Sequence, residues 1–208
     1  MTKLQKLISI ASAAFSLEPA SESNFEELPS ELSILLKNRN GFSAFESALV
    51  VFPAKESNGV PGIREWNDMT GWRRHYRTVL ADQYVCFAQD LFGLQFAISN
   101  RSIIRLNPET GNVTTYASNI EEWAKRLLEN YAEDTGWPLA HEWQLTHGFL
   151  PANYRLLPKL PFALGGEYEV ENLVALNCQQ VMNYWGKLYE TIRNVPDGKA
   201  VSLSGWIN

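Results

Sequence analysis

The sequence predicts an α+β fold. Apolar residues recur at spacings of three and four in some segments, as in amphipathic helices, while short apolar runs between turn residues indicate strands. The 208 residues are 45% hydrophobic and 12% aromatic, which is enough for a packed core. We expect a twisted mixed or antiparallel sheet with helices mainly on one face. A core over residues 1–135 would carry a C-terminal α/β extension over residues 136–208.

The N-terminal segment is predicted to be an amphipathic surface helix. Lys3 and Lys6 before an apolar stretch imitate a signal peptide, but serines interrupt that stretch. One helical stripe contains Leu4, Leu7, Ile8, Ala11 and Phe15. No run reaches the roughly 18 apolar residues of a membrane span. We therefore expect a cytoplasmic protein, with Cys86 and Cys178 as buried reduced thiols.

The next segments resemble a helix followed by a strand meander. After a linker over residues 19–29, a helix should begin at Pro29-Ser30 and end at Asn40-Gly41. A strand over Phe45–Phe52 and a long loop over residues 54–71 come next. The remaining strands of the meander are predicted at Tyr84–Ala88, Leu94–Ile98, Ile103–Leu106 and Val113–Tyr116.

A helix from residue 119 to just before Gly136 has the clearest periodicity. Ser118 and Glu121 have the spacing of a capping box, and Trp123, Leu127 and Leu128 belong to its apolar stripe. Glu121 with Lys125, and Glu122 with Arg126, would form pairs at spacing four.

The C-terminal part is predicted to be mostly irregular over residues 137–161, which contain four prolines, and ordered afterwards. We expect strands at Phe162–Leu164, Asn172–Leu176 and Ala200–Leu203, a helix over Gln179–Arg193, and a turn at Asp197-Gly198.

The sequence lacks the common catalytic motifs for acyl transfer, nucleotide binding and redox cysteine chemistry. His141 and His147 are six residues apart, so on a helix their rings would point to different sides and could not share a metal ion. We expect no metal, no cofactor and no catalytic residue.

Two acidic features have both a functional and a structural interpretation. Glu167, Glu169 and Glu171 alternate along the chain, so an extended strand would place all three on one face, either as a solvated surface or as a site for a cation or a basic partner. Asp90 and Gly93 lie between two strands. Asp90 is expected to accept backbone N–H groups in this turn, while a catalytic carboxylate would need a partner that the sequence does not identify.

One segment interleaves basic and aromatic residues, the types enriched at protein interfaces. Its members are Arg64, Trp66, Trp72, Arg73, Arg74, Tyr76 and Arg77. The net charge of −5 disfavours a nucleic-acid ligand and suits a basic protein partner. The alternative interpretation is that the aromatic residues close the core and the arginines are solvated.

The order of these features resembles that of the SUKH superfamily. The residues that carry the resemblance are Leu28–Leu32 leading to Asn40-Gly41, Phe87–Gly93, Asn107–Gly111 and the helix from Ile120. The segments Phe162–Tyr168 and Glu171–Leu173 are similar to a tail of longer bacterial members. Many bacterial members are immunity proteins that neutralise a toxin by stoichiometric binding, whereas eukaryotic relatives resemble regulatory scaffolds.

The resemblance implies a non-enzymatic, cytoplasmic, protein-binding module with a toxin domain as its partner and no binding to nucleic acid or membrane. An intracellular scaffold with an endogenous partner is the first alternative. A small-ligand binder or an enzyme that uses a pocket near Asp90 and Trp66 is the second. A deep pocket with converging polar groups would favour this second alternative.

Overall fold

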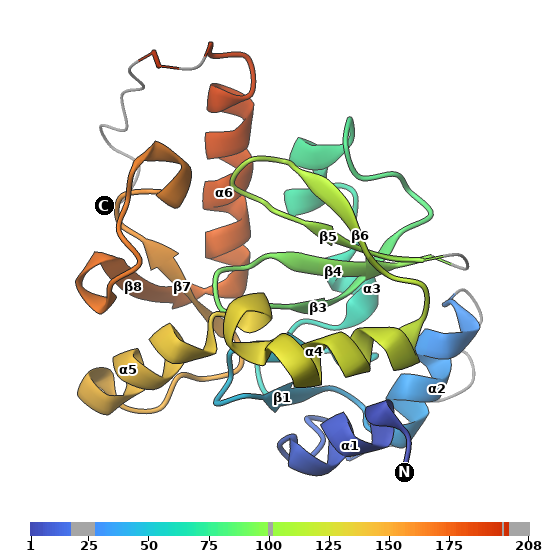
Figure 1. Cartoon of the computed structure of the whole chain (residues 1–208). Coiled ribbons are helices and arrows are strands. Elements are labelled where there is room, and N and C mark those ends of the chain that lie inside the picture. Colours follow the sequence, from blue (N-terminus) through green and yellow to red (C-terminus); the bar gives the residue numbers. More distant parts are fainter. Residues whose placement is uncertain (18–27, 100–101, 197, 200–208) are drawn as a thin grey trace.

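A six-stranded antiparallel sheet forms the centre of the molecule, and each strand pairs with the next along the chain (Figure 1). The structure is a computed structural model that describes residues 1–17, 28–99, 102–196 and 198–199. The strands are β1 (Phe42–Ala44), β2 (Leu49–Val51), β3 (Val85–Gln89), β4 (Gln95–Ile98), β5 (Ile103–Leu106) and β6 (Val113–Ala117). A separate antiparallel pair consists of β7 (Tyr154–Pro158) and β8 (Leu173–Asn177). The predicted α+β class is confirmed.

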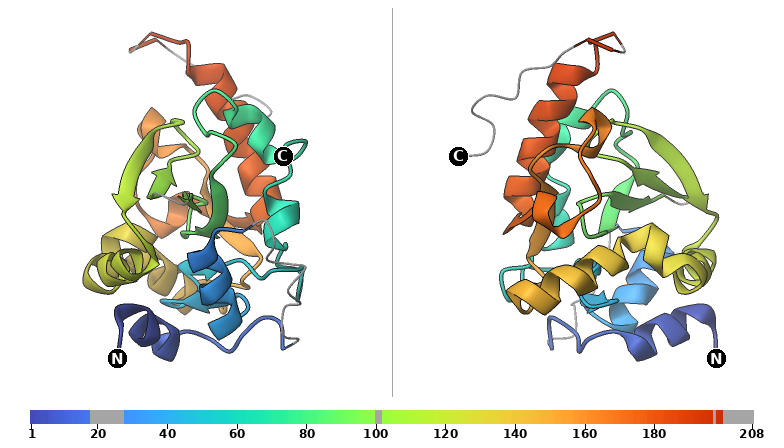
Figure 2. Two further views of the ribbon diagram at one scale, coloured as in Figure 1. Left: turned by 90° about the vertical axis from the view of Figure 1, so that its right-hand side faces the viewer. Right: turned by 60° about the vertical axis from the view of Figure 1, so that its left-hand side comes forward.

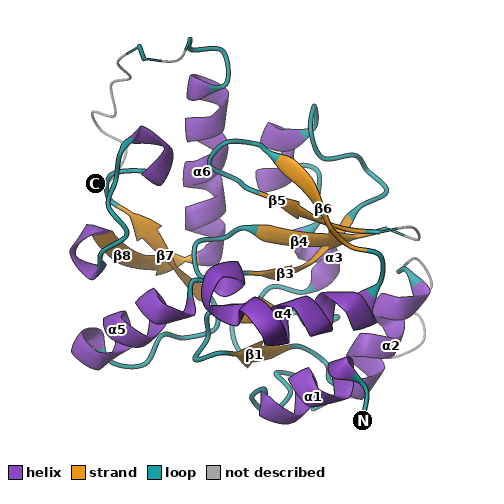
Figure 3. Ribbon diagram, viewed as in Figure 1, coloured by secondary structure: helices purple, strands orange, loops and turns teal. Residues whose placement is uncertain are grey.

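Helices surround this sheet (Figure 3). The α-helices are α1 (Lys3–Ile10), α2 (Ser30–Asn38), α3 (Ile63–Trp66), α4 (Ile120–Thr135), α5 (Trp137–His147) and α6 (Cys178–Ile192). The described residues also form the short 3-10 helices η2 (Trp72–Tyr76), η3 (Phe162–Leu164) and η4 (Val170–Asn172). Within the described ranges, no helix combines the length and apolarity needed to cross a bilayer.

Helices pack on both faces of the sheet, whereas we expected them mainly on one. On one face the ring of Trp123 in α4 lies 5.1 Å from that of Phe87 and 6.0 Å from that of Phe96. On the other face Gln95 accepts a hydrogen bond from Trp66 Nε1 of α3 at 2.7 Å. Figure 2 shows α4 and α6 on opposite sides of the central strands. The reason is the composition of β4, because all four of its residues are buried and both of its faces need cover.

The C-terminal helix α6 belongs to the same hydrophobic core as the sheet. Its buried residues Val181, Trp185 and Leu188 pack in one cluster with residues of β2 to β6. A close approach to η2 makes this possible, because a Cβ at Gly186 would lie 2.3 Å from Cδ2 of His75. A second cluster joins Leu91 to Trp143 of α5 and to Leu156 of β7. The helices α5 and α6 and the strand β7 therefore pack on the core.

A hairpin replaces the single strand that we predicted over Phe45–Phe52. The chain reverses between β1 and β2 through left-handed backbone conformations at Phe45 (φ 52°), Glu46 (φ 53°) and Ser47 (φ 64°). The amide of Ala48 closes the turn by donating to the carbonyl of Phe45 at 2.9 Å. Such conformations usually require glycine or asparagine, so the sequence gives no sign of this turn.

The prediction of an irregular segment over residues 137–161 was wrong, because the segment contains α5 and β7. Pro138 stands in the first turn of α5, where its missing N–H costs no helical hydrogen bond. Pro158 is the last residue of β7. Prolines at these positions mark the ends of regular elements and do not prevent them.

The α4 helix forms as predicted, with a different cap. Asn119 is the N-cap and accepts the amide of Glu122 at 2.8 Å, while Ser118 Oγ donates to Glu122 Oε2 at 2.6 Å. Glu122 also pairs with Arg126 at 2.8 Å. Glu121 instead accepts the amides of Lys3 and Leu4 at the start of α1. Its carboxylate therefore fixes α1 against α4, an arrangement that no local pattern predicts.

The other predicted elements have mixed outcomes. The strands β3 to β6 and β8 and the helices α2 and α6 match their predicted positions within about three residues. Phe162–Leu164 is a 3-10 helix and not a strand. The predicted strand at Ala200–Leu203 and Asp197 of the predicted turn lie outside the described residues.

Candidate functional site

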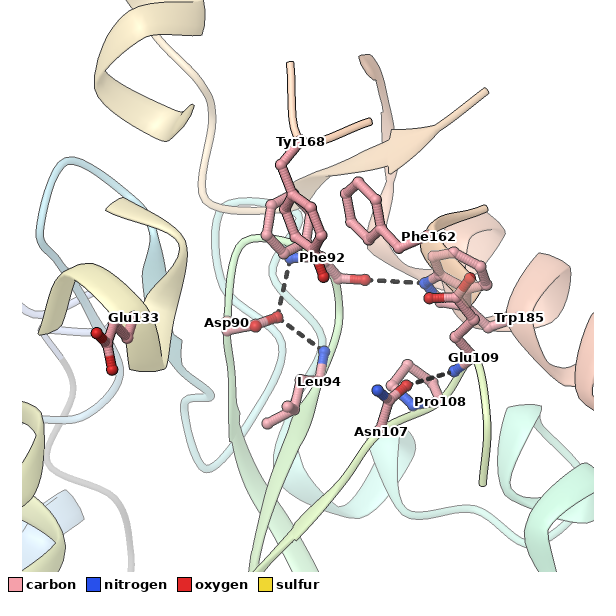
Figure 4. A pocket seen from close by; sticks show the side chains of 10 residues that line it. All are labelled: Asp90, Phe92, Leu94, Asn107, Pro108, Glu109, Glu133, Phe162, Tyr168 and Trp185. Atoms are coloured by element: carbon pink, nitrogen blue, oxygen red, sulfur yellow. Dashed lines mark hydrogen bonds between the residues drawn. The ribbon is translucent and has the colours of Figure 1, made fainter. Parts of the chain in front are cut away.

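A pocket of about 180 Å³ opens where the β3–β4 turn, the β5–β6 turn and the C-terminal segment meet (Figure 4). The β3–β4 turn contributes Asp90, Phe92 and Leu94, and the β5–β6 turn contributes Asn107, Pro108 and Glu109. Phe162, Tyr168 and Trp185 complete the wall from the C-terminal side, and Glu133 of α4 lies at the edge. The pocket therefore depends on both the meander and the C-terminal part.

Asp90 has the structural role in the turn that we predicted. Its Oδ1 accepts the amides of Phe92 and Leu94, both at 2.8 Å, and Gly93 completes the turn with φ +89°. Gln89 and Gln95 pair directly below this turn in the β3–β4 register. Among the described residues, none donates a hydrogen bond to the second carboxylate oxygen, Oδ2.

Glu109 reaches the pocket from the predicted turn at Asn107–Gly111. Asn107 Oδ1 accepts the amide of Glu109 at 2.9 Å, which sets the direction of the chain at this point. The side chain is 6% exposed, and its Oε1 accepts the amide of Ala163 at 2.7 Å. Oε2 accepts no hydrogen bond from the described residues. Glu109, like Asp90, thus has one oxygen held by a backbone amide and one oxygen without a donor.

Aromatic rings form the apolar part of the pocket wall. The rings of Phe162 and Tyr168 stack at 3.9 Å with an interplanar angle of 6°. Phe92 meets Phe162 edge-on at 5.1 Å and Tyr168 at 6.4 Å. Trp185 Nε1 donates to the carbonyl of Phe92 at 2.8 Å. Tyr168 is 65% exposed, so its ring extends this wall toward solvent.

Burial raises the pKa of both carboxyl groups. Desolvation raises the pKa of Asp90 to about 7, against the opposing effects of its two backbone hydrogen bonds and of Arg155 and Arg105. Desolvation also raises the pKa of Glu109, and the hydrogen bond from Ala163 opposes that change. The pKa of Tyr168 is raised by burial and by the nearby charges of Glu109 and Asp90. The hydrogen bonds and the nearby arginines therefore only partly offset the cost of a negative charge on these two carboxyl groups.

A buried cation lies behind the β3–β4 turn. Arg155 of β7 has no exposed surface, and its guanidinium donates to the carbonyls of Ser47 at 2.7 Å, Ala152 at 2.9 Å and Asp90 at 3.4 Å. Desolvation lowers the pKa of Arg155 to about 10. Arg155 connects β7 to the β1–β2 and β3–β4 turns and supports the pocket from behind.

The predicted basic and aromatic cluster does not form one surface. Trp66, Trp72 and Tyr76 are buried in a chain of ring contacts at 5.6 and 5.7 Å, so they close the core. Arg73 is only 4% exposed and donates to Asn67 Oδ1 at 3.2 Å. The prediction that these four residues belong to a partner surface was wrong, because a partner cannot contact buried side chains.

The other arginines of this cluster are exposed. Arg74 donates to the carbonyls of Thr70 and Gly71, and Arg77 donates to that of Met69. Arg64 lies exposed on α3. Arg64, Arg74 and Arg77 remain accessible to a partner.

The three alternating glutamates do not lie on a strand, which corrects that prediction. Glu167, Glu169 and Glu171 are exposed in an irregular stretch that enters η4. The carbonyl of Glu167 accepts Asn172 Nδ2 at 3.0 Å, and the carbonyl of Glu171 accepts Lys159 Nζ at 2.7 Å. Tyr168 between them turns to the pocket.

The histidines of α5 have separate partners. His141 Nδ1 lies 2.8 Å from Glu46 Oε2, and His147 stacks on Trp143 at 4.5 Å. In the described part of the chain, no group of three or more His, Cys, Asp or Glu residues is arranged to hold a metal ion. Cys86 and Cys178 are both free and buried.

The sequence pattern indicates a role for Asp90 but not for the residues that surround it in the pocket. Glu109 lies in a predicted turn and Trp185 in a predicted helix, but neither position indicates that its side chain reaches Asp90. The one signal in the sequence was that Tyr168 stands between Glu167 and Glu169. In an extended chain its aromatic side chain would point away from the face that carries the glutamates. Trp66, the other residue expected near this pocket, contacts Gln95 below the turn.

Comparisons with known proteins show similarity at the level of the fold. No protein-family model matches the chain, and no curated protein matches it. A crystal structure of Atu4351 from Agrobacterium tumefaciens aligns with a TM-score of 0.57 at 13% sequence identity, over 86% of each chain. Similarity at this identity indicates a shared fold and does not assign a function.

Proposed function

We propose that this chain is a protein-binding module that acts by stoichiometric binding and not by turnover. The observation that carries the proposal is the pocket at Asp90, whose volume is about 180 Å³. Sites for metabolites and cofactors usually enclose about 300–1,000 Å³. A pocket of this size suits one side chain of a partner better than a complete small molecule.

The arrangement of the carboxylates also supports binding. Asp90 and Glu109 each use one oxygen to accept backbone amides, and these hydrogen bonds hold the side chains in place. Preorganised groups of this kind reduce the ordering cost of association. The net charge of −5 favours a partner with a basic surface.

The more specific part of the proposal is a bacterial immunity protein of the SUKH type that neutralises a toxin in the cytoplasm. The order of helix, meander and helix resembles that superfamily, and the antiparallel meander β1 to β6 followed by α4 is compatible with it. Binding would cover the active site of the toxin or lock its conformation, without a covalent step. A scaffold with an endogenous partner would have the same surface chemistry.

A specific observation favours a second candidate, an enzyme or small-ligand binder. The pKa of Asp90 is raised to about 7 inside a pocket, and such a carboxyl group can exchange protons near neutral pH. A general acid or base would need a reacting group next to its free oxygen. Glu109 is the pocket residue best suited to help it.

Affinity capture followed by reconstitution tests the proposal. The full chain, immobilised through a tag, should retain a protein from extracts of its native organism. The recombinant pair should elute as one complex of fixed stoichiometry, and co-expression of the chain should relieve the toxicity of its partner. A captured small molecule that the chain converts, with no stable protein complex, would contradict the proposal and favour the second candidate.

A further inference from the structure

We propose that the pocket at Asp90 receives an arginine side chain of the partner protein, an inference that rests on the proposed protein-binding function. The pocket joins two features that recognise a guanidinium group: carboxylate oxygens without donors, and an aromatic wall. Neither feature was part of the predicted partner surface.

The carboxylates provide the polar half of the site. Asp90 and Glu109 are each 6% exposed, and each keeps one oxygen that accepts no hydrogen bond from the described residues. A planar guanidinium group carries five N–H donors in a fixed fork, which suits carboxylate oxygens that lack donors. An ammonium group is a compact, strongly hydrated charge, so it would gain less from leaving water for this pocket.

The aromatic wall provides the apolar half. The stacked pair of Phe162 and Tyr168 presents a ring surface that continues from the pocket to solvent, since Tyr168 is 65% exposed. Guanidinium groups stack on such rings and gain cation–π attraction, worth more when water is excluded. The methylene groups of an arginine side chain would pack along the same wall.

Charge complementarity supports a cationic occupant. The pocket contains Asp90 and Glu109, with Glu133 at its edge, and no Lys or Arg lines it in the described ranges. Of the two arginines whose charges act on Asp90, Arg155 is buried behind the turn and donates to main-chain carbonyls, and Arg105 pairs with Asp134 at 2.6 Å. An incoming guanidinium group would thus supply the donors that the two free oxygens lack.

A peptide titration tests this inference without the partner. The probes are the capped tripeptide Gly-Arg-Gly and the matched peptide with citrulline, which has nearly the same shape and no charge. Amide resonances of Phe92, Leu94 and Ala163, together with the indole N–H of Trp185, report on the pocket because their N–H groups bind Asp90, Glu109 or the turn. We expect the arginine peptide to shift these resonances and the citrulline peptide to bind about tenfold more weakly. A lysine peptide should lie between them.

Variants locate the binding. Glu109→Gln keeps an oxygen for the amide of Ala163, and Tyr168→Ala changes an exposed residue, so both should fold. Each should weaken binding of the arginine peptide several-fold, whereas the control Glu167→Gln, an exposed neighbour outside the pocket, should not. Equal binding of the arginine and citrulline peptides would overturn the inference, and so would tighter binding of the lysine peptide than of the arginine peptide.

The two proposals can fail separately. A partner complex that forms with unchanged affinity in Glu109→Gln would overturn the arginine inference and leave the protein-binding function in place. Specific arginine binding in a chain that captures no protein would support the pocket chemistry and count against the proposed function.

Discussion

Trp185 of α6 donates its indole N–H to the main-chain carbonyl of Phe92 at 2.8 Å, which ties the C-terminal helix to the β3–β4 turn. The same turn holds Asp90, so this hydrogen bond connects the pocket to an element more than 90 residues away in sequence. Trp185 is 1% exposed, so its indole N–H has little access to water and needs a partner within the protein. The pocket is thus a product of tertiary packing between the meander and α6.

Trp185→Phe should lower the free energy of unfolding by about 1–2 kcal/mol beyond its packing loss, because the carbonyl of Phe92 would lose its donor. Urea unfolding monitored by circular dichroism measures the change. Trp72→Phe is the matched control, since the indole nitrogen of Trp72 is buried without a hydrogen-bond partner. Equal losses in the two variants would show that the hydrogen bond contributes nothing.

Trp123 tests the packing of α4 on the sheet. The side chain has no exposed surface and lies against Phe87 and Phe96, as its place in the predicted apolar stripe requires. Trp123→Ala should cost roughly 3–5 kcal/mol as a large-to-small change in the core. Trp123→Phe should cost much less, because Nε1 of Trp123 makes no hydrogen bond that the change could remove. Chemical denaturation measures the free energy of unfolding of both variants. A nearly unchanged value for Trp123→Ala would show that α4 does not pack on the sheet through this residue.

Local sequence patterns predict the burial of Trp123 but not the hydrogen-bond partner of Trp185. Trp123 could be placed from local periodicity, because an amphipathic helix reveals its buried face at spacings of three and four. The role of Asp90 was likewise local, since a turn between two strands needs an acceptor for its amides. Trp185 was correctly placed in a helix, yet its partner depends on how that helix crosses the molecule.

The predictions that the structure contradicts concern residues whose contacts lie far away in the sequence. Phe45 to Ser47 have left-handed conformations in a turn whose Ser47 carbonyl accepts a hydrogen bond from Arg155, which is 108 residues away in sequence. The burial of Arg73 follows from its contact with Asn67, which also accepts the amide of Cys86 in β3. In the sequence, Arg73 beside tryptophans suggested a partner surface. In the structure its guanidinium group is buried and donates to Asn67.

Asp90 should make stability depend on pH in a characteristic window. The carboxyl has a pKa of about 7 in the folded chain against 3.8 as its ordinary value, so between these values the folded state binds more protons than the unfolded state. The free energy of unfolding should then fall as pH rises from about 4 to 7, by at most about 4 kcal/mol from this group, and level off above that range.

Asp90→Asn should flatten this pH dependence, because Asn keeps an oxygen for the amides of Phe92 and Leu94 and cannot ionise. Thermal or urea unfolding at pH 4, 5.5, 7 and 8 measures the profile. Asp82→Asn is the control, since Asp82 is exposed, and it should leave the profile of the parent chain intact. A parent profile with no decline from pH 4 to 7 would show that Asp90 ionises normally.

The two thiols should react slowly in the folded chain. Burial raises the pKa of Cys86 to about 12 and also raises that of Cys178, so the reactive thiolate is scarce at neutral pH. Ellman's reagent should titrate two thiols per chain only after denaturation. Rapid reaction of either thiol in the native protein would contradict the burial of that cysteine.

Arg155 is expected to be the most sensitive position behind the pocket. Arg155→Met would leave the carbonyls of Ser47 and Ala152 without their guanidinium donor and should cost about 3–5 kcal/mol, the usual result of removing one partner from a buried charged network. The change would also raise the pKa of Asp90 further, because the charge of Arg155 now lowers it.

Arg155→Lys keeps that charge but cannot donate to all of these carbonyls at once, so it should lose stability while the pKa of Asp90 stays near that of the parent chain. Urea unfolding gives the stabilities, and carbon-13 titration of the Asp90 carboxyl gives the pKa. Parent-like stability in Arg155→Met would show that the buried guanidinium does not hold the turns together.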